Sequence, residues 1–96
     1  MYTYNIPLVA DGKLYQLRCA RHIKKVLKKY KKTYLVIEKI HEPDEWKVFS
    51  VWNYLKMNFR KDEIMVIYVY GKERTEEEEL LNEVCRCIYE NLSKFN

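Results

Sequence analysis

The sequence predicts one α/β domain in which a mixed four-stranded sheet packs against three helices. Two observations support this fold class. The spacing of the apolar residues switches between two and about 3.6 along the chain, as it does in alternating strands and helices. The chain has 96 residues, which is about one domain, and only two Gly and two Pro are present to form connections. We therefore expect a single α/β domain over residues 1–96, with short loops and no linker.

The N-terminal segment is predicted to form a β-hairpin. One face of residues 1–10 carries alternating apolar side chains, Tyr2, Tyr4, Ile6 and Leu8. Asp11-Gly12 is a favoured two-residue hairpin turn, because both central positions of that turn prefer positive φ. Residues 13–19 would then pair back as the second strand. Pro7 has no amide hydrogen to donate, so the first strand is expected at an edge of the sheet.

The rest of the chain is predicted to alternate between helices and strands. Apolar residues at i, i+3, i+4 and i+7 predict the first helix over residues 20–32. A β-branched and aromatic run predicts a strand over 33–40, and a nearly continuous apolar run predicts a central buried strand over 64–70. Between these strands, Pro43 opens a helix that ends near Arg60. Thr75 and Glu78 fit a capping box that starts the last helix. The predicted order is β-β-α-β-α-β-α.

Composition and cysteine content limit the class of protein. The hydrophobic fraction is 48% and the aromatic fraction is 15%, which is too apolar for a disordered chain. No apolar run approaches the roughly 20 residues that a bilayer span requires, and the N-terminus lacks the pattern of a signal peptide. Three cysteines, an odd number, are typical of reduced thiols. We therefore expect a cytoplasmic protein that does not associate with membranes.

Charge is distributed unevenly between the two halves of the chain. Residues 1–39 contain ten Lys or Arg and two acidic residues, whereas residues 40–96 contain eight Lys or Arg and twelve acidic residues. Eight of the basic residues, and no acidic residue, lie between Arg18 and Lys32. Such an asymmetry favours an anionic partner for the first half of the chain.

The basic residues are predicted to form a purely cationic helix face. On a helical wheel Arg21, Lys25, Lys28 and Lys32 project opposite the apolar set. Like charges at i, i+4 oppose helix formation by roughly 0.2–0.5 kcal/mol per pair, so this face is costly unless it binds an anion. We predict a non-enzymatic module, with nucleic acid, DNA or RNA, as the partner. The phosphates would be contacted by Arg21, Lys24, Lys25, Lys28, Lys29 and Lys32, with Arg18 and Lys31 as secondary contacts. Exposed tyrosines beside this face would stack on unpaired bases.

Three alternatives remain open at this stage. The basic face is either solvated or neutralised by the acidic C-terminal helix, in the same chain or in a second copy. The protein is otherwise an interaction module, such as a viral inhibitor of a host complex, that presents the carboxylates of residues 76–79 and Glu83 to a basic site. The remaining alternative is a metal-dependent nuclease, because Asp44, Glu45 and Lys47 superficially contain both elements of such a site.

Other candidate sites are weaker. Cys19 and His22 with Cys85 and Cys87 resemble a zinc ligand set, but the spacing C-x-C on a helix directs its two thiols about 200° apart. His41 lacks a partner nucleophile. We therefore expect no catalytic residue, no metal and no cofactor. The two tryptophans of the second helix, Trp46 and Trp52, favour a homodimer contact, because Trp is enriched at the centres of interfaces.

The composition resembles that of small uncharacterised proteins from hyperthermophilic archaea and their viruses. The chain is rich in Lys, Glu, Tyr and Ile and has a single Gln, as in the segments KKVLKKYKKTYLVIEKI and KDEIMVIYVYGKERTEEEELL. The resemblance covers the whole chain but contains no motif. It implies a cytoplasmic, thermostable protein. Viral proteins of this size often bind DNA or inhibit host defence, so the resemblance implies one of these two roles.

Overall fold

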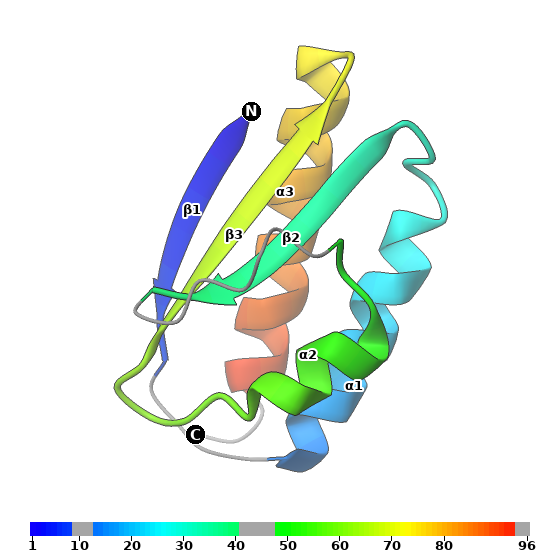
Figure 1. Ribbon diagram of the computed structural model, residues 1–96. Helices are drawn as coiled ribbons and strands as arrows, with labels where there is room; N and C mark the ends of the chain where they lie inside the picture. Colours follow the sequence, from blue (N-terminus) through cyan, green and yellow to red (C-terminus); the bar gives the residue numbers. More distant parts are fainter. Residues whose placement is uncertain (9–12, 41–47, 94–96) are drawn as a thin grey trace.

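The computed structural model describes residues 1–8, 13–40 and 48–93 (Figure 1). Three strands alternate with three helices along this part of the chain. In chain order they are β1 (Tyr2–Pro7), α1 (Lys13–Leu27), β2 (Thr33–Lys39), α2 (Val51–Met57), β3 (Ile64–Gly71) and α3 (Arg74–Ser93). The α/β class is thus confirmed.

The sheet formed by the described residues has three strands in the order β1-β3-β2. β3 pairs antiparallel with both neighbours, from Tyr2↔Val69 to Pro7↔Ile64 on one side and from Thr33↔Gly71 to Lys39↔Met65 on the other. The prediction of a mixed four-stranded sheet is therefore wrong. The central position of β3 and the edge position of β1 were both predicted correctly.

The missing fourth strand is the N-terminal part of α1. Residues 13–19 were predicted as the second strand of a hairpin, but they form the first turns of this helix. Its buried side chains recur at helical spacing, because Gln16, Cys19, Ala20 and Ile23 are each at most 2% exposed. Gln16 is polar, so the apolar pattern did not reveal that the buried stripe begins there. The predicted turn at Asp11-Gly12 lies outside the described residues.

The ends of α1 and α2 also differ from the predictions. α1 ends at Leu27 rather than at residue 32, and the chain continues in tight turns in which the amides of Lys29 and Tyr30 donate to the carbonyls three residues before them. α2 begins only at Val51, where the Ser50 hydroxyl accepts a hydrogen bond from the Asn53 amide at 3.1 Å. It ends at Asn58, which adopts a left-handed conformation with φ 48°.

The core lies between one face of the sheet and the helices. α1 and α3 lie side by side behind the sheet, and α2 crosses the N-terminal half of α1 (Figure 1). Side chains of alternate strand residues point into this layer, and they include Ile6, Leu35, Ile37, Ile67 and Val69. The residues between them, which include Tyr34 and Tyr70, therefore lie on the opposite face of the sheet.

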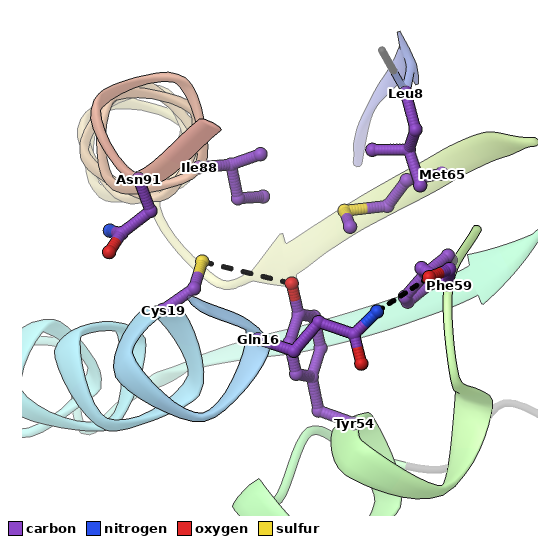
Figure 2. A pocket seen from close by; sticks show the side chains of 8 residues that line it. All are labelled: Leu8, Gln16, Cys19, Tyr54, Phe59, Met65, Ile88 and Asn91. Carbon is purple, nitrogen blue, oxygen red and sulfur yellow. Dashed lines mark hydrogen bonds between the residues drawn. The ribbon is translucent and has the colours of Figure 1, made fainter. Parts of the chain in front are cut away.

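Gln16 joins α1 to the segment that follows α2. Its side-chain amide is 2% exposed and donates a hydrogen bond of 2.7 Å to the Phe59 carbonyl (Figure 2). A buried carbonyl that loses its donor retains the cost of its lost hydration. Gln16 is therefore part of the core through this hydrogen bond.

We predict that Gln16→Leu lowers the free energy of unfolding by about 1–3 kcal/mol, because the Phe59 carbonyl is left without this donor. Urea denaturation followed by circular dichroism measures the change. Thr3→Ala, at an exposed position of β1, serves as the control and should change stability by less than about 0.5 kcal/mol. A Gln16→Leu protein as stable as the original chain would contradict the role assigned to this hydrogen bond.

Candidate nucleic-acid interface

The outward face of α1 is cationic. Arg18, Arg21 and Lys25 are all exposed and follow the spacing i, i+3, i+7, directly opposite the buried Ile23. Lys24 is exposed beside them. At 1.5 Å rise per residue the three outward charges extend over about 10 Å of the helix. This part of the predicted basic face is therefore present on one solvent-facing surface.

The remaining predicted residues lie in the loop between α1 and β2, not on the helix. Lys28, Lys29, Lys31 and Lys32 are all exposed there. The predicted helical stripe is thus wrong beyond Leu27, because the chain turns at that point. The loop still continues the positive charge from the helix to the start of β2. We call the eight residues together the basic surface: Arg18, Arg21, Lys24, Lys25, Lys28, Lys29, Lys31 and Lys32.

The acidic residues of α3 neutralise one edge of this surface. Lys29 Nζ lies 3.8 Å from Glu83 Oε1, with both groups partly exposed. The pKa of Tyr30 is raised, first by partial burial and then by its hydrogen bond to Glu83. The negative charges of Glu83, Glu79 and Glu76 raise it further. An exposed pair of this kind contributes little to stability.

Other carboxylates of α3 contact β1 instead. Glu77 lies 3.0 Å from the N-terminal ammonium of Met1, and Glu78 accepts a hydrogen bond of 2.7 Å from the Tyr2 hydroxyl. The predicted capping box is wrong, because α3 already begins at Arg74, one residue before Thr75, and Glu78 accepts a hydrogen bond from β1. Of the eight cations of the basic surface, Lys29 alone has an ion-pair partner within the described part of the chain.

A groove lies where the basic surface reaches the sheet. It has a volume of about 450 Å³ and is lined by Lys31, Lys32, Tyr34, Tyr70, Gly71 and Lys72. The rings of Tyr34 and Tyr70 stack at a centroid distance of 5.3 Å and an interplanar angle of 25°. We call it the tyrosine groove. The sequence did not identify Tyr34, Tyr70 or Lys72 as site residues, because only the pairing of β2 with β3 brings them together.

The interior cavity of Figure 2 is too small for a substrate. Its volume is about 10 Å³, which is room for one water molecule. Gln16, Cys19, Tyr54 and Asn91 contribute polar atoms to its lining. The Asn91 amide nitrogen donates to the Cys87 carbonyl at 2.6 Å, whereas its buried oxygen has no hydrogen-bond partner. This cavity fits a single structural water and no larger ligand.

The proposed zinc ligands do not converge. Residues 1–8, 13–40 and 48–93 contain no group of three or more His, Cys, Asp or Glu side chains placed to hold a metal ion. Cys19 is buried, while His22 is exposed. Burial raises the pKa of Cys19 to about 12 and that of Cys85 to about 11, so both are protonated thiols near neutral pH.

Several predicted residues fall outside the described part of the chain. His41, Asp44, Glu45, Trp46 and Lys47 lie in residues 41–47, so the nuclease and general-base hypotheses stay predictions. Trp52, the second tryptophan proposed for a dimer contact, is 67% exposed and lies under Lys56 Nζ at 5.3 Å from the ring centroid.

Comparison with known proteins adds no assignment. No protein-family model matches the chain, and no curated protein matches it significantly in sequence. The compositional resemblance to proteins of hyperthermophilic archaea and their viruses therefore stays a prediction. No helix in the described ranges is both long enough and apolar enough to cross a bilayer.

We predict that the thiols of Cys19 and Cys87 resist alkylation in the folded chain, because both are buried and the pKa of each is raised. Iodoacetamide labelling at about pH 8, read by mass spectrometry, should modify both only after unfolding in urea. An exposed thiol introduced by Thr3→Cys is the control and should react in the folded chain. Labelling of Cys19 as fast as this control would show that the site is accessible.

Proposed function

We propose that this protein is a nucleic-acid-binding module whose basic surface contacts phosphates. The observation that supports the proposal is the outward face of α1, where Arg18, Arg21 and Lys25 are exposed side by side. None of the three has an ion-pair partner among the residues described, although the chain contains fourteen acidic residues. Charges left unpaired in this way favour an anionic ligand.

The residue types indicate how such a surface binds. Most of its cations are lysines, which are compact, flexible point charges suited to phosphate oxygens rather than to base edges. Contacts of this kind depend little on sequence and weaken as salt rises, because binding releases condensed counterions. We therefore expect binding with little sequence preference. No reaction chemistry is required for this function.

Homodimerisation accompanies this proposal as a separate prediction. Trp52, on the short helix α2, is a large aromatic side chain that is 67% exposed. Large exposed aromatic groups of this kind are enriched at interface centres. α2 packs near the N-terminal half of α1, so a contact there leaves the lysine loop accessible.

We predict that Lys25→Glu combined with Lys28→Glu weakens binding to a fluorescent oligonucleotide by at least about tenfold, because two phosphate contacts become repulsions. Fluorescence anisotropy at low salt measures the dissociation constant. Lys25 lies in the last turn of α1, where a negative charge slightly destabilises a helix. Circular dichroism therefore has to show that the double variant is still folded.

The matched control carries the same change in net charge elsewhere. Lys56→Glu with Arg60→Glu alters two exposed cations in and after α2, outside the basic surface. This control should bind within about twofold of the original chain if location matters more than total charge. If both double variants lose affinity equally, net charge alone explains the loss, and α1 is not the binding site. A chain that binds no oligonucleotide would overturn the proposal entirely.

A further inference from the structure

The tyrosine groove has the chemistry of a site for an unpaired base. Lys31, Lys32 and Lys72 line the same hollow of about 450 Å³ as the two stacked rings. Tyr34 is 49% exposed, so a large part of its surface is accessible to a ligand. Aromatic rings offer a stacking surface to any base, and adjacent cations bind the phosphates that connect bases.

The position of these rings separates them from the core. Tyr34 and Tyr70 are paired across β2 and β3, on the sheet face opposite to the one that α1 and α3 cover. Thr33, one residue earlier, points to the helix side, where its hydroxyl donates to Glu76 at 3.2 Å. The two tyrosines therefore form a platform at the end of the sheet where β2 starts and β3 ends, the upper end in Figure 1.

Gly71 lines the groove where β3 ends beside the start of β2. A β-carbon at this position would lie 2.9 Å from the Thr33 hydroxyl oxygen and 3.0 Å from the Lys32 carbonyl oxygen. Both distances are shorter than ordinary contacts of a β-carbon, so a side chain at this position would force Thr33 or Lys32 to shift.

The basic surface leads into this groove. Lys31 and Lys32 belong to both, because the loop that follows α1 ends at the start of β2. The outward face of α1 and the tyrosine rings lie on opposite sides of the sheet, so a strand that contacts both must pass along this loop and around the end of the sheet where β2 starts. A rigid duplex keeps its bases stacked on one another and cannot offer a base face to Tyr34.

We propose that the ligand of the basic surface is single-stranded nucleic acid, and that one of its bases stacks on Tyr34 in the tyrosine groove. This inference rests on the proposed function, because it assigns the same phosphate-binding surface a preferred form of nucleic acid. Lys31, Lys32 and Lys72 hold the phosphates that flank the stacked base. Tyr70 supports the Tyr34 ring from its other side.

The test compares a fluorescent oligothymidylate with a duplex of the same length, by anisotropy. The original chain should bind the single strand more tightly than the duplex. Tyr34→Ala should weaken binding of the single strand by about fivefold or more, the loss expected for one stacked base, and leave duplex binding unchanged. Tyr34→Phe keeps the ring and should retain binding. Tyr34→Leu keeps the bulk of an apolar side chain and should behave like Tyr34→Ala, which separates stacking from folding.

Tyr4→Ala is the matched control, because Tyr4 is 44% exposed on the edge strand β1, outside the groove. Its variant should bind like the original chain. If Tyr34→Ala binds oligothymidylate normally while Lys25→Glu with Lys28→Glu does not, the groove is rejected and the basic surface stands. If Tyr34→Ala weakens both ligands equally, stacking is also rejected. If the original chain binds neither ligand, the groove and the proposed function fail together.

Discussion

The placement of the carboxylates of α3 determines the electrostatics of this molecule. α3 packs across the sheet, so its first turns reach β1, where Glu77 meets the N-terminal ammonium and Glu78 accepts the Tyr2 hydroxyl. Farther along, Glu83 lies beside Lys29. These contacts direct negative charge toward β1 and one edge of the lysine loop. The outward face of α1 is left positive, since Arg18, Arg21 and Lys25 point away from α3 and the core.

The strand order links this positive face to the aromatic platform. β1 and β2 flank β3, so the connection through α1 crosses the sheet and delivers its lysine loop to the end where β3 finishes. Antiparallel pairing of β2 with β3 then sets Tyr34 opposite Tyr70 and Thr33 opposite Gly71. The lysines of the loop and the tyrosine rings of β2 and β3 therefore meet in the tyrosine groove. The surface chemistry thus depends on the topology of the sheet.

The sequence predicted the elements whose patterns are unambiguous. β3 is a continuous apolar run, and α3 has a long apolar stripe, so both were found. α1 was misread because Gln16, a polar residue held by the Phe59 carbonyl, occupies a buried helical position. Its C-terminal end was overextended because lysines favour helix and carry no stop signal. The cations of the basic surface were identified from charge alone, but Tyr34 and Lys72 belong to the groove only through strand pairing that no local pattern encodes.

The salt dependence of binding tests the central claim most directly, because it counts the phosphates that the basic surface is proposed to neutralise. The logarithm of the association constant for oligothymidylate should fall linearly with the logarithm of salt concentration. The slope should be about −0.7 for each phosphate contact. If each of the seven cations without an ion-pair partner among the described residues contacts one phosphate, the predicted slope is about −5. A slope near zero would contradict the account, because binding would then not depend on the charges of the basic surface.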